Sequence, residues 1–123
     1  MKYSEIYKEW RDNPIEFWKK NAEDVSWIKF PEKILKKKSK YFYEWFSDGI
    51  LNTCYNAVDK NILEGRGDEV AIYYDSPITN SKSKLTYNEL KSKVEKFAGA
   101  LKKYNISKGD RVIVYMPMIT EAI

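Results

Sequence analysis

Histidine is absent from the 123 residues of this chain, and cysteine occurs once, as Cys54. Without histidine the chain has no Ser-His-Asp triad, no Cys-His pair and none of the commonest zinc ligand. A single cysteine excludes an intrachain disulfide, which fits a protein of a reducing compartment. We interpret Cys54 as a buried structural thiol on a short helix, because no histidine can activate it as a nucleophile.

Glycine is also scarce, with 5 residues, so little backbone is free to wrap a phosphate group. The stretch "GRG" at 65–67 lacks the G-x-x-x-x-G-K-[ST] spacing of a phosphate-binding loop. The Arg-Gly-Asp tripeptide at 66–68 is interpreted as an ordinary loop, because three residues recur by chance. The carboxylates Asp68, Glu69 and Asp75 are interpreted as caps and solvent-facing partners in preference to an acid–base pair.

Long apolar runs are missing as well, and none approaches the roughly 18 residues that span a bilayer. The first ten residues, "MKYSEIYKEW", contain no apolar signal-peptide region, and Glu5 and Glu9 argue against an organelle transit peptide. Charged residues make up 33% of the chain. We therefore expect a solvated surface and no membrane partner.

The excess of basic residues is small, 22 − 18 = +4, and the dense basic run is "KILKKKSKYFYEW" at 33–45. Lys36 to Lys40 with Tyr41, Phe42 and Tyr43 fit a single-strand nucleic-acid binder. A nucleic-acid domain usually clusters its basic residues on one face. We prefer a solvated lysine-rich segment ahead of an aromatic anchor, and we expect no nucleic-acid partner.

The first third of the chain is rich in aromatic residues. Asn-Pro at 13–14 is typical of a helix start, and apolar residues at spacings of 3 and 4 predict a helix over 14–24. A shorter helix is predicted over 4–10, an extended segment over 41–46, and a turn at 48–49. Because this region has too little periodicity to form its own core, we expect it to pack on another domain.

The remainder of the chain has the patterns of an α/β protein. Asn52 predicts the cap of a helix that Gly65 ends. The segments 69–75 and 83–87 predict a β-hairpin. Threonine and glutamate at 86–89 form a capping box, which predicts the start of a helix. Apolar residues then follow at helical spacing, so this helix has the clearest sequence pattern in the chain.

The apolar run "RVIVYM" predicts a strand over 110–116 that is buried on both faces, as in a parallel sheet covered by helices. A helix is expected to begin at 118–123. Because a lone parallel strand needs neighbours, we expect the chain to be part of a longer protein. Tyr115 to Met118 fit a ligand pocket at the end of a strand, but packing is the preferred interpretation.

Three stretches together resemble the N-terminus of short-chain AMP-forming acyl-CoA synthetases, which are the propionyl-CoA and acetyl-CoA ligases of the adenylate-forming superfamily. They are "YKEWRDNPIEFWKKNAEDVSWIKFPEKIL", "YEWFSDGILNTCYNAVDKNILEGRGDEVAIYYDSPIT" and "KLTYNELKSKVEKFAGALKKYNISKGDRVIVYMPM". The combination of "LNTCYNA" with "GRGDEVAIYYDSP" favours the propionyl-CoA branch. Lys60-Asn61 depart from the family's usual Arg-His, and Asn105-Ile106 from its usual Gly-Val.

The resemblance implies an α/β fold in which an aromatic-rich helical cap, residues 1–49, precedes the start of the large AMP-binding domain, residues 50–123. It implies a parent enzyme that uses ATP, magnesium and CoA to activate propionate or acetate, in the cytoplasm or alternatively the mitochondrial matrix. The family's phosphate loop and catalytic lysine match no motif here. We therefore assign no catalytic, cofactor-binding or metal-binding residue, and expect an inactive structural segment whose partner is the remainder of the enzyme.

A different class of function stays open on the residues alone. The chain fits a stand-alone interaction module that docks through its aromatic leader and the exposed edge beside "RVIVYM".

Overall fold

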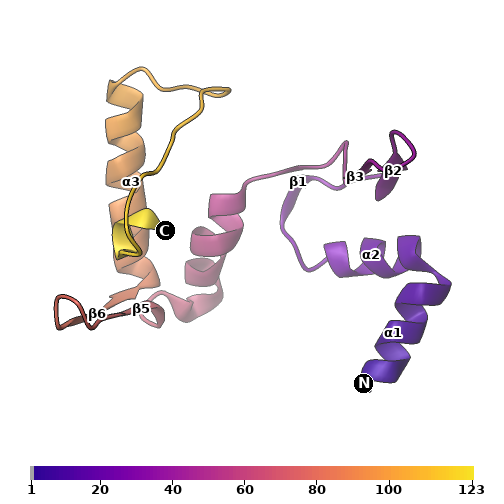
Figure 1. Ribbon diagram of the computed structural model, residues 1–123, viewed down its shortest axis with the longest axis horizontal. Coiled ribbons are helices and arrows are strands. Elements are labelled where there is room, and N and C mark those ends of the chain that lie inside the picture. Colours follow the sequence, from indigo (N-terminus) through magenta and orange to yellow (C-terminus); the bar gives the residue numbers. More distant parts are fainter. Residues whose placement is uncertain (1) are drawn as a thin grey trace. The chain divides into compact units, whose positions relative to one another are not determined.

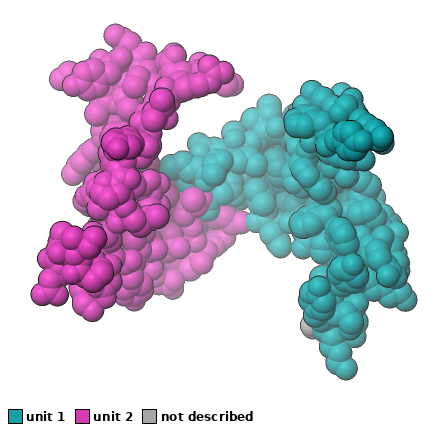
Figure 2. Space-filling model, viewed as in Figure 1, with its two compact units in different colours: residues 1–56 teal, residues 57–123 magenta. Residues whose placement is uncertain are grey.

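A computed structural model describes residues 2–123 of the chain (Figure 1). The chain divides into two compact units, residues 1–56 and residues 57–123, which Figure 2 shows in different colours. We call them the N-terminal unit and the C-terminal unit, and each is described by itself.

Two helices open the N-terminal unit, α1 (Tyr3–Asp12) and α2 (Pro14–Ala22). The Asn13 side-chain oxygen accepts a hydrogen bond from the backbone N–H of Glu16 at 3.5 Å. Proline is tolerated at the first helical position because its missing N–H has no partner there in any helix. Both predicted helices are confirmed, with α1 longer than expected and α2 ending at Ala22.

Two short antiparallel ribbons follow in the N-terminal unit. β1 (Trp27–Lys29) pairs with β4 (Ile50–Leu51), and β2 (Leu35–Lys37) pairs with β3 (Tyr43–Trp45). β3 confirms the central part of the extended segment predicted over 41–46, whereas Phe46 has a φ of 49° and is not extended. The backbone N–H of Gly49 donates to the Phe46 carbonyl at 3.0 Å, which confirms a turn at this point.

Aromatic rings from separate elements contact one another in the N-terminal unit. Trp18 meets Trp45 edge to face with ring centroids 5.6 Å apart, and Trp27 lies 5.5 Å from Phe46. The Trp27 indole N–H donates to the Ala22 carbonyl at 2.8 Å, and Ala22 is buried. Trp18 and Trp45 stay 37% and 48% exposed, so these ring contacts do not enclose a core. This agrees with the expectation that the region has too little periodicity to form its own core. Packing on another domain stays a prediction.

Residues 53–66 are helical and contain two stretches with π-type hydrogen bonding, η1 (Tyr55–Asp59) and η2 (Ile62–Arg66). The predicted cap is confirmed, because the Asn52 side-chain oxygen accepts the backbone N–H of Tyr55 at 3.0 Å. Gly65 adopts a φ of 85°, the left-handed conformation that glycine takes readily at helix ends.

A hairpin and a long helix complete the regular part of the C-terminal unit. β5 (Val70–Ser76) pairs antiparallel with β6 (Ser81–Thr86), and α3 (Tyr87–Lys103) follows directly. The Thr86 side chain accepts the backbone N–H of Glu89 at 3.3 Å, and the Glu89 carboxylate accepts the N–H of Thr86 at 2.8 Å. The predicted hairpin and capping box are both confirmed.

The predicted buried strand over 110–116 is wrong for this structure. Residues 111–117 have no regular secondary structure, and Ile113 and Tyr115 are 89% and 99% exposed. A strand needs a neighbouring backbone for its hydrogen bonds, and none of the strands within residues 2–123 pairs with this segment. A short 3-10 turn, η3 (Thr120–Ala122), lies where a helix was expected to begin.

The chain therefore mixes helices and strands, with two helices first and short strands next, as expected for the N-terminal part of an α/β enzyme. All the ladders within residues 2–123 are antiparallel. Within the same residues, no helix is both long and apolar enough to cross a membrane.

Candidate functional site

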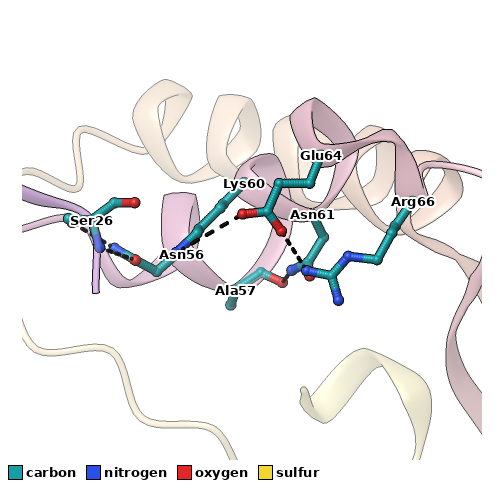
Figure 3. A network of polar contacts seen from close by, with 7 residues as sticks. All are labelled: Ser26, Asn56, Ala57, Lys60, Asn61, Glu64 and Arg66. Carbon is teal, nitrogen blue, oxygen red and sulfur yellow. Dashed lines mark hydrogen bonds and ion pairs between the residues drawn. The ribbon is translucent and has the colours of Figure 1, made fainter. Parts of the chain in front are cut away.

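Asn56, in helix 53–66, makes several side-chain hydrogen bonds inside the N-terminal unit. Asn56 accepts the backbone N–H of Ser26 at 2.8 Å and donates its amide N–H to the Ser26 carbonyl at 2.9 Å (Figure 3). The same amide donates to the Asn52 carbonyl at 3.0 Å. These bonds occupy the polar atoms of Asn56, so its role is to hold residue 26 beside the helix start.

Side chains further along the helix make polar contacts of their own. Glu64 lies 4.0 Å from the Lys60 ammonium and 2.7 Å from the Arg66 guanidinium, and Asn61 donates to the Ala57 carbonyl at 2.8 Å (Figure 3). Lys60 and Asn61 are the positions that depart from the resembled pattern. Both serve local helix contacts here.

An ion pair joins this helix to α3 inside the C-terminal unit. The Lys91 ammonium lies 2.8 Å from a carboxylate oxygen of Asp59 and 3.9 Å from Glu95. The hydrogen bond to Asp59 and the charge of that carboxylate raise the pKa of Lys91. A lysine that acts as a base or nucleophile needs a lowered pKa. We therefore interpret Lys91 as a structural residue that links the two helices through its ion pair.

The carboxylates singled out in the sequence take part in structural contacts. Asp68 accepts the Asn88 side-chain amide at 3.0 Å, and Asp75 pairs with Lys82 at 2.7 Å. The carbonyl of Glu69 accepts the backbone N–H of Tyr87 at 3.1 Å. The interpretation of these residues as caps and solvent-facing partners is confirmed for Asp68 and Asp75.

The Arg-Gly-Asp tripeptide at 66–68 lies in the turn between helix 53–66 and β5. Gly67 is buried, and a Cβ built on it would lie 2.7 Å from the Asn88 amide nitrogen. Arg66 pairs with Glu64 and Asp68 accepts the Asn88 amide, so both charged side chains serve local contacts, which supports the ordinary loop.

Two expectations about apolar residues are wrong. Cys54 is exposed, because it stands in the first turn of its helix, while the buried Val58 lies one turn further on. Tyr115, Met116 and Pro117 line a shallow hollow without Met118, and the Tyr115 ring is in solvent. They therefore form neither the preferred packed arrangement nor an enclosed pocket.

A second hollow lies in the N-terminal unit and is lined by Ser26, Trp27, Ile28, Asn52 and Tyr55. Its polar lining residues Ser26 and Asn52 already hydrogen-bond within the unit. Within residues 2–123, no three His, Cys, Asp or Glu side chains gather as metal ligands would. Ser26 and Asn52 therefore hold the backbone of this hollow in place.

The chain has an aromatic-rich N-terminal segment, then a helix, a hairpin and a long helix. This order is consistent with the N-terminal part of an adenylate-forming enzyme. The family model described as AMP-binding enzyme matches residues 59–123, and the chain belongs to that family. The model described as acetyl-coenzyme A synthetase N-terminus matches residues 3–57. The predicted resemblance is confirmed.

Individual relatives agree with the family models. The chain is 50% identical over 111 residues to the human (Homo sapiens) mitochondrial acyl-CoA synthetase short-chain family member 3, covering 90% of this chain and 16% of the relative. It is 41% identical over 118 residues to the acetyl-coenzyme A synthetase of Streptomyces coelicolor, covering 96% of this chain and 18% of the relative. The chain thus spans less than a fifth of the length of these curated relatives.

Proposed function

We propose that residues 1–123 are the N-terminal region of a short-chain acyl-CoA ligase that activates propionate or acetate. The observation that carries this proposal is the pair of consecutive family matches, residues 3–57 and 59–123, which together account for nearly the whole chain. The 50% identity to a short-chain acyl-CoA synthetase supports the same class of activity.

The reaction of such a ligase has two steps. A carboxylate oxygen of the acid attacks the α-phosphorus of ATP, and the bond to pyrophosphate breaks to leave an acyl-adenylate. The sulfur of CoA then attacks the acyl carbon, the bond to AMP breaks, and the thiol gives up its proton. Magnesium would neutralise the phosphate charge, as it does in other phosphoryl chemistry.

The chain's own residues contribute a scaffold in this proposal, and we assign none of them a contact with ATP, magnesium, CoA or the acid. Residues 1–49 would form the cap and residues 50–123 the start of the large domain. The capped helix 53–66, tied to α3 by the Lys91–Asp59 pair, supports a rigid start for that domain. The remainder of the enzyme would be the partner.

The compartment belongs to the same proposal. The relatives named above are a mitochondrial protein and a bacterial acetyl-coenzyme A synthetase. We place the ligase in the cytoplasm, with the mitochondrial matrix as the alternative.

The first test is to read the gene beyond codon 123. A frame that continues into a Ser/Thr/Gly-rich phosphate loop supports the ligase, and an immediate stop codon contradicts it. The second test mixes the purified 123-residue chain with propionate, ATP and CoA. We expect no thioester from this chain and propionyl-CoA or acetyl-CoA from the full reading frame; thioester from the 123 residues alone would refute the structural role.

The stand-alone interaction module is a second candidate, and one observation favours it. The apolar segment 111–117 exposes Val112, Ile113 and Tyr115 to solvent instead of burying them. A stop codon directly after Ile123 would support this module, because the exposed segment would then need another protein to cover it.

A further inference from the structure

The ribbon of β2 and β3 ends in a tight tip (Figure 1). Aromatic rings at this tip are exposed. The backbone N–H groups of Lys38 and Ser39 both donate to the Phe42 carbonyl, at 2.9 and 3.2 Å, and so close the loop. Tyr41 is 82% exposed and Phe42 60%. Neither ring is in contact with another aromatic ring within residues 2–123.

Lysines surround these rings. The Lys40 ammonium lies 5.0 Å from the centroid of the Tyr41 ring, and Lys37 lies 5.9 Å from that of Tyr43. Lys38 forms an ion pair with Glu44. In the part of the chain that the structure describes, Lys36, Lys37 and Lys40 form no ion pair, so their charges are available to an anionic partner.

The base of the ribbon is anchored, in contrast to its tip. Trp45 packs edge to face on Trp18 with centroids 5.6 Å apart, and the Phe46 N–H donates to the carbonyl of the buried Ile34 at 2.9 Å. The base of the ribbon is therefore held in place, while Tyr41, Phe42 and the neighbouring lysines lie exposed at the tip.

An anionic phospholipid surface fits this arrangement better than a nucleic acid does. Aromatic rings settle at the headgroup level of a bilayer, and lysine stems cover apolar surface while their ammonium groups stay in water. A single strand needs several rings open along a groove. Tyr43 and Trp45 are 46% and 48% exposed, but Trp45 lies against Trp18 at the base of the ribbon. Each strand has three residues, so the most exposed rings gather at the tip and do not follow a groove.

We propose that the tip of the β2–β3 ribbon, residues 36–43, docks the protein reversibly on membranes rich in anionic phospholipid. The Tyr41 and Phe42 rings enter the interface, and Lys36, Lys37 and Lys40 contact headgroup phosphates. This departs from the expectation of no membrane partner, and it does not depend on the ligase activity.

The test is co-sedimentation of the full 123-residue chain with phosphatidylcholine vesicles, with and without phosphatidylserine. We expect binding only when phosphatidylserine is present, and weaker binding as salt is raised. The variant K36Q/K37Q/K40Q should bind about 100-fold more weakly, since each lysine near an anionic surface contributes roughly five-fold. The variant Y41S/F42S keeps every charge and should also lose most of the binding.

The matched control is K84Q/K96Q/K103Q, which removes the same charge from exposed positions of β6 and α3. It should bind as the parent chain does, with unchanged tryptophan fluorescence in all variants. Equal loss in this control would show a general charge effect and overturn the proposal. Absence of binding to anionic vesicles, or tighter binding to single-stranded RNA than to vesicles, would overturn it as well.

Discussion

Asn56 is the residue whose side chain joins two parts of the N-terminal unit that are 30 positions apart in sequence. Its amide makes hydrogen bonds to both backbone groups of Ser26 in a half-buried setting. Asn56→Ala leaves these groups without partners, so we expect a loss of about 1–3 kcal/mol in the free energy of unfolding. Urea unfolding monitored by tryptophan fluorescence measures this loss.

Asn21→Ala is the matched control, because Asn21 donates one exposed hydrogen bond to the Phe17 carbonyl within its own helix. It should change stability by less than about 0.5 kcal/mol. Equal effects in the two variants would mean that the bridge to Ser26 contributes nothing beyond one exposed bond.

Gly49 is required by a close approach. A Cβ at this position would lie 2.7 Å from the Trp27 ring and 3.1 Å from the Pro31 side chain. Pro31 is fully buried, so it has little room to move away from an added methyl group. We expect Gly49→Ala to lower the free energy of unfolding by about 1–3 kcal/mol. Gly99→Ala in α3 meets no atom within 4 Å and should instead stabilise by about 0.5–1 kcal/mol. Thermal unfolding of both variants tests the contrast, and a stabilised Gly49→Ala would contradict it.

At the scale of elements, the turn before β4 carries a pH-sensitive contact. The Asp48 carboxylate accepts the backbone N–H of Lys33 at 2.9 Å and that of Glu32 at 3.4 Å. The bond from Lys33, with a smaller contribution from Glu32, lowers the pKa of Asp48 below its ordinary value of 3.8. Because its pKa is lowered, the ionised Asp48 carboxylate stabilises the folded state fully above pH 3.8. This contribution is lost as pH falls through the pKa of Asp48 in the folded state.

We therefore expect Asp48→Asn to flatten the decline of stability at acid pH while lowering stability near neutrality. Ser47→Ala changes the same turn without removing the carboxylate and should keep the acid decline of the parent chain. Unfolding curves recorded from neutral pH to below pH 3.8 measure both. A decline of the same steepness in Asp48→Asn would show that other carboxylates cause it.

Elements whose signals are local were predictable from the sequence. Asn13, Asn52 and Thr86 each accept a backbone N–H three residues later, as their cap patterns indicated. The hairpin of β5 and β6 was predictable for the same reason, since β-branched and aromatic residues flank a polar turn.

Elements whose state depends on distant partners were not predictable. The composition of 110–116 is that of a core strand, but no strand within residues 2–123 lies beside it as a partner. Cys54 lies near an apolar helix face, yet its burial depends on what packs over the first turn. The π-type hydrogen bonding of η1 and η2 has no signal in the sequence that we could use.

At the scale of the whole molecule, the exposed apolar segment 111–117 decides how the 123-residue chain behaves in solution. Ile113 and Tyr115 are almost fully exposed beside the half-exposed Val112 and Val114. Contiguous apolar surface and unpaired backbone promote association between chains. We expect the chain to bind an apolar dye and to form concentration-dependent oligomers. The double variant Ile113→Thr with Tyr115→Thr should weaken both dye binding and oligomer formation.

The control variant replaces the same residue types elsewhere, as Ile78→Thr with Tyr73→Thr. Both of these residues are exposed on the hairpin of β5 and β6. Dye fluorescence and sedimentation velocity distinguish the pairs. Equal behaviour of the two double variants would show that the segment 111–117 is not the adhesive surface.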